Sequence, residues 1–288
     1  IQSKNIKHAT QIHTQLITNN MSPPFLFNNL VNLYAKCGHI NQSLTLFSKT
    51  HDGFKNVVTW TSLITQLSHH KKPLQALNFF NQMRSTGVYP NQFTFSAILP
   101  ACADTKLVVH GEQVHSLICK HGFEFDLFVG SALVDMYAKC FEMRAAERVF
   151  DEMPERNLVS WNSMIVGFLL NKLYDQAVRF FKEVLRETLI TPDQVSFSSV
   201  LSACANMGCV DIGRQVHGVV IKHGLITLAY VKNSLMDMYC KCGFFEDAIK
   251  LFQTIGDRDV VTWNVMVMGC VQNDNFEEAC NYFWVLRR

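Results

Sequence analysis

The stretch VDMYAKC (134–140) decides the fold, because two close copies of it occur elsewhere in the chain. VNLYAKC ends at Cys37 and MDMYCKC ends at Cys242, so the three final cysteines are 103 and 102 residues apart. A lysine beside a cysteine can stabilise a reactive thiolate, which raises the question of a catalytic residue at Cys140. A nucleophile is needed only once, however, and a motif that occurs three times at nearly constant spacing indicates repeated architecture.

Two further segment types recur with the same period. VVTWTSLI (57–64), LVSWNSMI (158–165) and VVTWNVMV (260–267) form one set, and FTFSAILPACA (93–103) and VSFSSVLSACA (195–205) form another. The period of about 102 residues is therefore a superrepeat of three related repeats. Placed end to end, the repeats occupy 1–23 (partial), 24–56, 57–91, 92–126, 127–157, 158–193, 194–228, 229–259 and 260–288 (partial).

Each repeat has the pattern of a helical hairpin, as 57–91 shows. Its first half carries apolar residues at the 3-to-4 spacing of one helix face: Trp60, Leu63, Ile64 and Leu67. Its second half begins at Pro73, which suits a first helical turn, and predicts a second apolar face: Leu74, Leu77, Phe80 and Met83. Gly87 is the expected stop. A single hairpin of this size cannot bury its apolar face, so we expect an all-α solenoid of stacked helix-turn-helix repeats.

The composition excludes several classes of protein. With 288 residues, of which 48% are apolar, the chain can bury a large core and does not need a disulfide framework. Its net charge of +2 is too small for a polybasic nucleic-acid binder, so affinity for phosphate must come from local placement of Lys and Arg. The apolar runs are far shorter than the roughly 20 residues of a membrane span. The chain opens on Ile1 and stops within a helical pattern, so we expect it to be a piece of a longer protein.

Half of the ten cysteines occupy two recurring positions, which favours small buried hydrophobic side chains in a reducing compartment. These are Cys37, Cys140 and Cys242 at the first position and Cys102 and Cys204 at the second.

The motifs in rotation, VVTWNxxI, ACAxxGxxxxGxQVH and LVDMYAKCG, with repeat lengths of 35, 35 and 31 residues, resemble the PLS class of pentatricopeptide repeat (PPR) proteins. The resemblance implies one right-handed superhelical solenoid over 1–288, with repeats in the order L-S-P-L-S-P-L-S-P. It also implies sequence-specific binding of single-stranded RNA in a plant mitochondrion or chloroplast, specifying a site for C-to-U RNA editing or other RNA processing. Multiple organellar RNA editing factors (MORF proteins) would be partners, recruited through L repeats.

Proteins of this family read one base per repeat, with the fifth residue separating purine from pyrimidine and the last residue reading amino against keto groups. At any single helix start, a small polar residue is equally well explained as a helix cap. The resemblance assigns base reading to the P and S repeats, at Asn28 with Asn56, Thr61 with Asn91, Ser131 with Asn157, Asn162 with Asp193, Asn233 with Asp259, and Asn264. The L repeats, with Ser96 and Asp126 or Ser198 and Leu228 at these positions, are left without an assigned base. The implied site is 5′-YANAUNUY-3′.

Two more sets of residues recur: an apolar residue once per repeat, and a lysine once per superrepeat. The second residue of each repeat is apolar and would count as core on periodicity alone, whereas the family resemblance implies that it clamps a base. The clamping set is Phe25, Val58, Phe128, Val159, Tyr230 and Val261. Lys36, Lys139 and Lys241 share one position of the S repeats and are either solvated lysines or phosphate contacts along the groove.

The tripeptide His110-Gly111-Glu112 matches the H-x-E of zinc-dependent nucleobase deaminases. No C-x-x-C follows it anywhere in the chain, so the remaining zinc ligands are missing. We therefore expect no catalytic residue, metal or cofactor here, and any deaminase domain would lie C-terminal to Arg288. The histidines that recur at 102-residue spacing, His13, His115 and His217, are expected to be packed side chains rather than ligands.

A competing interpretation is a protein-interaction scaffold of tetratricopeptide-like helical hairpins without RNA specificity. A peptide-binding groove gives no reason to restrict two positions per repeat to Asn, Thr or Ser and to Asn or Asp, so the sequence favours RNA. Neither interpretation involves a membrane or a small-molecule substrate.

Overall fold

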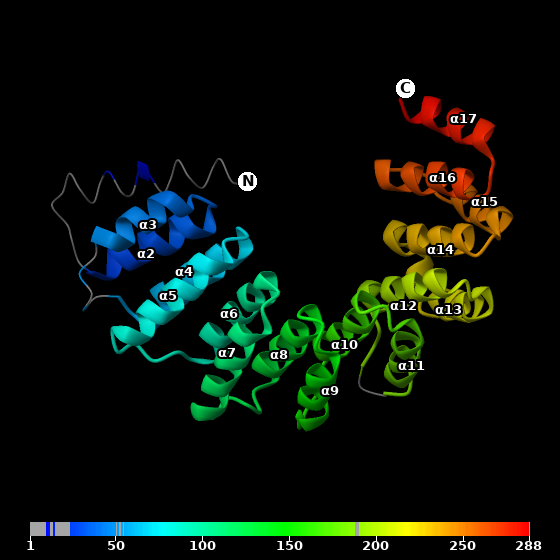
Figure 1. Ribbon diagram of the computed structural model, residues 1–288. Coiled ribbons are helices and arrows are strands. Elements are labelled where there is room, and N and C mark those ends of the chain that lie inside the picture. The colour runs from blue at the N-terminus through cyan, green and yellow to red at the C-terminus, as the bar shows by residue number, and fades with distance from the viewer. Residues whose placement is uncertain are drawn as a thin grey trace. The chain divides into compact units, whose positions relative to one another are not determined.

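The computed structural model describes residues 10, 11, 14, 24–49, 51, 53, 55–187 and 190–287. Within these residues the protein has 16 α-helices, one 3-10 turn at Leu225–Thr227 and no strand (Figure 1). The all-α prediction is therefore confirmed for this portion of the chain. Two compact parts are present, Ile1–Glu155 (the N-terminal part) and Arg156–Arg288 (the C-terminal part). Most of the predicted repeat 1–23, including His13, lies outside the described residues.

Each complete repeat of the N-terminal part forms two helices joined by a short turn. The first helices pack in series, α2 on α4, α4 on α6 and α6 on α8, and each second helix packs on the first helix of its own repeat. The helices are α2 (Pro24–Lys36), α3 (Ile40–Lys49), α4 (Val57–His69), α5 (Pro73–Ser85), α6 (Gln92–Thr105), α7 (Val108–Lys120), α8 (Leu127–Lys139) and α9 (Met143–Glu152).

The C-terminal part repeats this arrangement, with the first helices α10, α12, α14 and α16 stacked in series. Its helices are α10 (Leu158–Leu170), α11 (Tyr174–Val184), α12 (Gln194–Met207), α13 (Val210–Lys222), α14 (Ala229–Lys241), α15 (Phe245–Gln253), α16 (Val260–Gln272) and α17 (Phe276–Leu286). Each part is thus a stack of helical hairpins, as the repeat pattern predicts.

The hairpin 57–91 follows the sequence prediction closely, with one correction. The predicted face of α4 is buried, α5 begins at Pro73, and Gly87 takes the left-handed conformation (φ +79°) just after α5 ends. Leu74, however, is 67% exposed, and Ala76 is buried with Phe80 and Met83 instead. The prediction was wrong at Leu74 because the buried face of α5 is narrow, and a large side chain at the first turn lies beside that face rather than on it.

A tryptophan in the first helix of the repeats 57–91 and 260–288 joins the second helices around it. Trp60 lies edge-on to Phe47 of the preceding repeat, with ring centroids 4.6 Å apart, and also contacts Phe79 of its own repeat. Trp263 makes the same pair of contacts with Phe252 and Tyr282. Such aromatic pairs add about 0.5–1.5 kcal/mol each beyond the area that they bury, so this residue stabilises the stacking of one hairpin on the next.

Four of the five recurring cysteines, Cys37, Cys102, Cys140 and Cys204, are buried in this core, whereas the prediction was wrong for Cys242, which is partly exposed. Cys102 and Cys204 are fully buried, and burial raises the pKa of each thiol to about 12. Cys140 is also buried, its pKa is raised by the same cause, and its Sγ lies 4.0 Å from Met136 Sδ. A thiol with a raised pKa is protonated at neutral pH and is a poor nucleophile. The lysine–cysteine motif is therefore a packing motif.

We expect Cys140→Ala to lower the free energy of unfolding by about 1–2 kcal/mol, because it removes a small buried side chain and leaves a small cavity. Urea denaturation followed by circular dichroism would measure this change. Ligand binding by the folded variant should be unaffected. A folded variant that loses all binding would restore the hypothesis of a functional thiol.

Glycine permits close approach between the second helix of an L repeat and the first helix of the S repeat that follows. A Cβ added at Gly111 in α7 would collide with Met136 in α8, and a Cβ added at Gly213 in α13 would collide with Met238 in α14. Both methionines are fully buried, so either would have to repack within the core to make room. The glycine of the His110-Gly111-Glu112 tripeptide thus has a packing role.

Gly213→Ala should destabilise the protein by about 1–3 kcal/mol, because overpacking against Met238 outweighs the roughly 1 kcal/mol by which alanine favours a helix. Gly218→Ala is the matched control on the same helix, since nothing lies within 4 Å of a Cβ at that position. Thermal and urea denaturation should show the control equal to or more stable than the parent. Equal stability of the two variants would contradict the close approach.

Candidate functional site

The apolar second residues of the repeats are exposed, although their spacing alone would place them in the core. Their side chains are 40–67% exposed in every case that the structure describes: Val58, Phe93, Phe128, Val159, Val195, Tyr230 and Val261. The side chain of Phe25 lies outside the described residues. An apolar side chain presented to solvent at one fixed place per repeat is typical of a binding surface.

One pocket in the N-terminal part brings several predicted residues together. It has a volume of ≈ 300 Å³ and lies between α2, α4 and the start of α6. The second residues Val58 and Phe93 line it, together with the fifth residue Thr61 and the last residue Asn91 of the P repeat. Lys36 of the preceding repeat also lines it. Apolar side chains, hydrogen-bonding groups and a cation therefore meet in one cavity.

A second pocket has the same construction in the C-terminal part. Its volume is ≈ 320 Å³, and helices α12, α14 and α16 supply most of its lining. Tyr230 and Val261 are the second residues of consecutive repeats, and Asn233 is the fifth residue between them. Asn233 is 6% exposed, and among the described residues its Oδ1 has no hydrogen-bond partner. Apolar side chains therefore meet hydroxyl and amide groups in this pocket, a lining typical of ligand-binding sites.

The last residue of a repeat caps the first helix of the next repeat. Its Oδ1 accepts the backbone N–H of the third residue of that repeat at 2.8–3.0 Å. The capping residues are Asn56, Asn91, Asp126, Asn157, Asp193 and Asp259, whereas Leu228 makes no side-chain cap. The cap interpretation is therefore correct for these residues. It does not exclude base contact, since the cap uses Oδ1 and leaves Nδ2 of each Asn or Oδ2 of each Asp.

The cap also fixes what the remaining atom can do. A backbone N–H can only donate, so the asparagine atom that it contacts must be the oxygen, and the amide nitrogen is left as a donor. An aspartate in the same place leaves a second acceptor oxygen. The carboxyl of Asp259 has a lowered pKa, because it accepts hydrogen bonds from the backbone and the hydroxyl of Thr262. Asp259 is therefore ionised at neutral pH and cannot donate.

The fifth residues differ in their partners. Thr61 Oγ1 lies 2.7 Å from Thr94 Oγ1, and Asn162 donates from Nδ2 to Asp193 Oδ1 at 3.1 Å. In contrast, the serines Ser96, Ser131 and Ser198 donate to backbone carbonyls of their own helices, at 2.9, 2.7 and 3.2 Å. Asn28 is buried and Asn264 is exposed. The pair Ser131 and Asn157 is divided between the two compact parts, and each is described within its own part.

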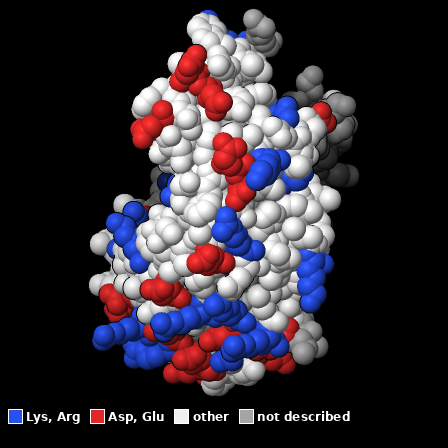
Figure 2. Space-filling view, turned by 90° about the vertical axis from the view of Figure 1, so that its right-hand side faces the viewer, with Lys and Arg blue, Asp and Glu red and all other residues white. Residues whose placement is uncertain are grey.

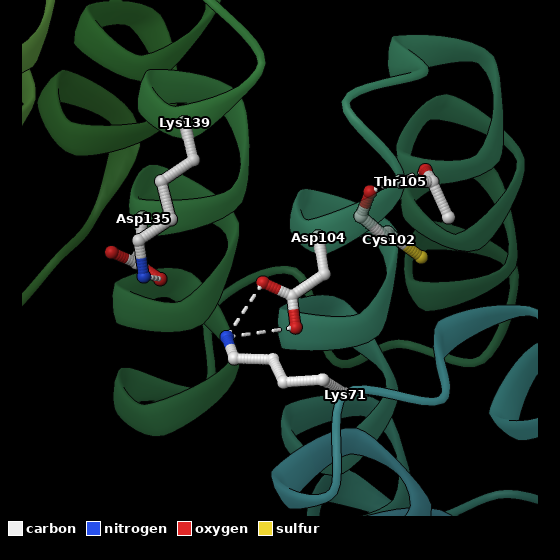
Figure 3. Close-up of polar contacts among 6 residues, drawn as sticks. All are labelled: Lys71, Cys102, Asp104, Thr105, Asp135 and Lys139. Atoms are coloured by element: carbon white, nitrogen blue, oxygen red, sulfur yellow. Dashed lines mark hydrogen bonds and ion pairs between the residues drawn. The ribbon is translucent and has the colours of Figure 1, made fainter.

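Two of the three recurring lysines have a carboxylate partner, which sequence reasoning did not foresee. Lys139 Nζ lies 2.6 Å from Asp135 Oδ2, and Lys241 Nζ lies 2.7 Å from Asp237 Oδ2, one helical turn away (Figure 3 shows the first pair). Asn32 occupies the corresponding position below Lys36. Among the described residues, Lys36 therefore has no carboxylate partner. The signal was present in the sequence as VDMYAKC and MDMYCKC against VNLYAKC.

The N-terminal part contains a further ion pair. Lys71, in the turn between α4 and α5, contacts both carboxylate oxygens of Asp104 on α6, at 3.0 and 3.2 Å (Figure 3). On the face of the molecule that Figure 2 shows, basic and acidic side chains are interspersed. Local pairing of this kind is consistent with the small net charge, and it leaves individual cations such as Lys36, rather than a broad field, to attract an anion.

His110, His115 and His217 each have a hydroxyl partner in the structure. His110 Nδ1 lies 3.2 Å from Thr105 Oγ1, and the described residues contain no group of three or more His, Cys, Asp or Glu side chains placed to hold a metal ion. His115 and His217 lie 2.9 and 3.0 Å from the hydroxyls of Tyr137 and Tyr239, respectively. Burial lowers the pKa of both histidines. They link α7 to α8 and α13 to α14, as packed histidines at a fixed place of the L repeat.

Comparison with known proteins identifies the repeats. The chain matches the PPR repeat over 25–51, 131–158, 159–189, 230–260 and 261–288, and the PPR repeat family over 55–104. These matches cover more than half of the chain. A mitochondrial pentatricopeptide repeat-containing protein of Arabidopsis thaliana is 38% identical over 261 residues, which are 91% of this chain and 41% of that protein. A chloroplastic relative from the same plant is 34% identical over 283 residues, covering 98% of this chain and 35% of that protein.

The fold agrees with these matches. The crystal structure of the pentatricopeptide repeat protein PPR10 in complex with an 18-nt psaJ RNA element superposes with a TM-score of 0.75 at 18% sequence identity. The superposition covers 96% of this chain and 42% of PPR10. In the part of the chain that the structure describes, no helix is long and apolar enough to cross a membrane. The chain spans less than half the length of the relatives that it matches, and it belongs to the pentatricopeptide repeat family.

Proposed function

We propose that this chain binds single-stranded RNA and reads one base per P or S repeat. The observation that carries the proposal is the pocket in which exposed Val58 and Phe93 flank Thr61 and Asn91. A base inserted between the two apolar side chains would stack on them and offer its edge to the two polar ones. Val58 and Phe93 belong to consecutive repeats, so each further repeat supplies one more clamp.

The helix caps provide the chemistry of reading. An asparagine whose Oδ1 is held by the cap offers a donor, which suits adenine or cytosine because each has an unprotonated ring nitrogen on its Watson–Crick edge. An aspartate in the same place offers an acceptor, which suits the ring N–H of guanine or uracil. The identity of the last residue thereby separates A and C from G and U, in agreement with the reading code implied by the family resemblance.

Applied repeat by repeat, the code gives the proposed target. Thr61 with Asn91 and Ser131 with Asn157 select A, whereas Asn162 with Asp193 and Asn233 with Asp259 select U. Asn28 with Asn56 selects a pyrimidine, preferably C, and Asn264 selects a pyrimidine. With the chain parallel to the 5′→3′ direction, the proposed site is 5′-YANAUNUY-3′, where N marks the L repeats.

The second part of the proposal concerns the organelle and the process in which the chain acts. The relatives are named as mitochondrial or chloroplastic proteins, and the PPR10 crystal structure is that of a complex with RNA. We place this chain in one of these organelles, where it would specify a site for C-to-U editing or other processing, with MORF proteins as partners of the L repeats. The chain would supply recognition and no chemistry of its own.

The decisive test exchanges the two reading residues of the repeat 158–193. Asn162→Thr with Asp193→Asn reproduces the pair found at Thr61 and Asn91, so the preference at the matching nucleotide should move from U to A. Fluorescence anisotropy with RNAs that differ only at this nucleotide would measure the preference. Each matched base should contribute about 1–3 kcal/mol, so a mismatch should weaken binding several-fold or more.

Two controls accompany the exchange. Preferences at the nucleotides facing the other repeats should stay as they are, and the dependence of affinity on salt should not change, because no phosphate contact is altered. A double variant that still prefers U would show that these side chains do not read the base. If the folded parent chain binds no single-stranded RNA at low salt, the whole proposal is refuted.

Lys36 should contribute more to phosphate binding than Lys139 or Lys241. Lys36 has no carboxylate partner among the described residues, whereas a phosphate must displace Asp237 to reach Lys241. Lys36→Gln should lower the slope of log affinity against log salt by about 0.7, the value for one phosphate on a single strand. Lys241→Gln is the matched variant and should lower the slope by less. Equal slopes for the two variants would contradict the neutralising role of the aspartate.

A further inference from the structure

The third residue of a repeat is absent from the two-residue reading pattern, yet at both P-to-L junctions it contacts the reading residues. Thr94 and Ser196, the third residues of the two L repeats, are fully buried. Thr94 Oγ1 lies 2.7 Å from Thr61 Oγ1 and donates to Asn91 Oδ1 at 3.0 Å. At the other junction, one buried hydroxyl likewise lies within hydrogen-bonding distance of both reading side chains: Ser196 Oγ is 2.6 Å from Asn162 Oδ1 and 3.1 Å from Asp193 Oδ1.

In the P repeat 57–91 this hydroxyl decides the polarity of the fifth residue. Thr94 accepts the backbone N–H of Asn91 at 3.3 Å and gives its own proton to Asn91 Oδ1. The hydroxyl of Thr61 must therefore donate to Thr94, which leaves Thr61 with an acceptor lone pair for a ligand. The exocyclic amino group of adenine is a donor and matches it.

In the P repeat 158–193 the same hydroxyl produces the opposite polarity. Ser196 donates to Asn162 Oδ1, and Asn162 Nδ2 donates one of its two hydrogens to Asp193 Oδ1. The second N–H of Asn162 is then left for a ligand. Uracil carries carbonyl acceptors beside its ring N–H, which match this donor and the free oxygen of Asp193.

The L-to-S junctions have no such hydroxyl, because valine occupies the third position at Val129 and Val231. Both valines are fully buried. The fifth residues of these L repeats, Ser96 and Ser198, donate to carbonyls of their own helices instead. Their hydroxyl protons are thus committed to the backbone, and no buried hydroxyl at the third position links them to the next repeat.

We propose that the buried hydroxyl at the third position is, at the P-to-L junctions, a positioning residue that sets the donor or acceptor character of the fifth residue of the P repeat, and that the L repeats 92–126 and 194–228, followed by valine, lack this positioning. This inference rests on the proposed RNA-reading function. It adds a third position, in the following L repeat, to the two that determine which base a P repeat prefers.

Thr94→Val is the first test, since valine has nearly the same shape and occurs naturally at this position of the S repeats. Affinity for RNAs with A, G, C or U opposite the repeat 57–91 would be measured by fluorescence anisotropy. The preference for A over the other bases should fall by about threefold to tenfold, the effect of one lost hydrogen bond. Thr94→Ser should keep the preference, because the hydroxyl remains.

Thr262→Val separates positioning from helix capping. Thr262 donates to Asp259 Oδ1 at 2.8 Å as Thr94 does to Asn91, but no hydrogen bond joins it to the fifth residue Asn233. This variant loses the same capping hydrogen bond, and urea denaturation would show what that costs. Whatever its effect on affinity, its preference for U at the matching nucleotide should be retained.

Val129→Thr is the reverse test, because it introduces the hydroxyl at an L-to-S junction beside the cap Asp126. The repeat 92–126, with Ser96 and Asp126, should then gain a preference for G of about threefold relative to the parent chain. An unchanged preference for A in Thr94→Val, equal losses in Thr94→Ser and Thr94→Val, or no gain of preference in Val129→Thr would each overturn the proposal.

One further variant separates this proposal from the function on which it rests. Thr61→Asn with Asn91→Asp should move the preference of that repeat from A to U. If the exchange leaves the preference unchanged, the two-residue reading itself is wrong. If the exchange succeeds while Thr94→Val has no effect, only the role of the third residue is overturned.

Discussion

The hydrogen bond between the last side chain of one repeat and the backbone N–H of the third residue in the next is the constraint on which the rest depends. It begins the first helix of each P repeat, of the L repeats 92–126 and 194–228, and of the S repeat 127–157, at a fixed residue. It also holds the capping side chain by one oxygen, with the other atom uncommitted. The same hydrogen bond therefore serves the fold and, under the proposed function, base reading. Asparagine or aspartate at these positions is explained by both roles together.

The stacking of the hairpins turns this helix cap into a defined exposure of each residue in the first helix. When the first helix starts at a defined residue, the second residue of the repeat faces solvent and the fourth faces the core. In α4 these residues are the exposed Val58 and the buried Trp60. The glycines that admit Met136 and Met238, and the tryptophans that bridge second helices, set how closely consecutive hairpins approach. The pockets between neighbouring first helices follow from that approach, which is why they recur with the same kinds of lining residue.

Electrostatics in this protein is local. The net charge is +2, and several basic side chains are paired with a carboxylate, as in Lys71 with Asp104 and Lys241 with Asp237. Exposed pairs of this kind contribute little to stability, typically about 0–1 kcal/mol. Their larger effect is to neutralise positions that would otherwise attract an anion. Under the proposed function, this arrangement would leave discrimination to the pockets, where apolar side chains exclude water and each hydrogen bond is worth more than at the open surface.

The sequence by itself determined the repeat length, the helical hairpins, the burial of Cys37, Cys102, Cys140 and Cys204, and the recurrence of an apolar second residue, although not its exposure. These follow from local periodicity and from the one-dimensional character of stacked repeats. Only the tertiary structure decided how side chains from neighbouring repeats pair. The partner of Thr61 is Thr94, 33 residues away, and the partner of Lys71 is Asp104 on the next first helix. The exposure of Leu74 depends on helix rotation that spacing does not specify. A hydrogen bond is set by the position and direction of two atoms to within a few tenths of an ångström, and that precision arises only when the hairpins are packed.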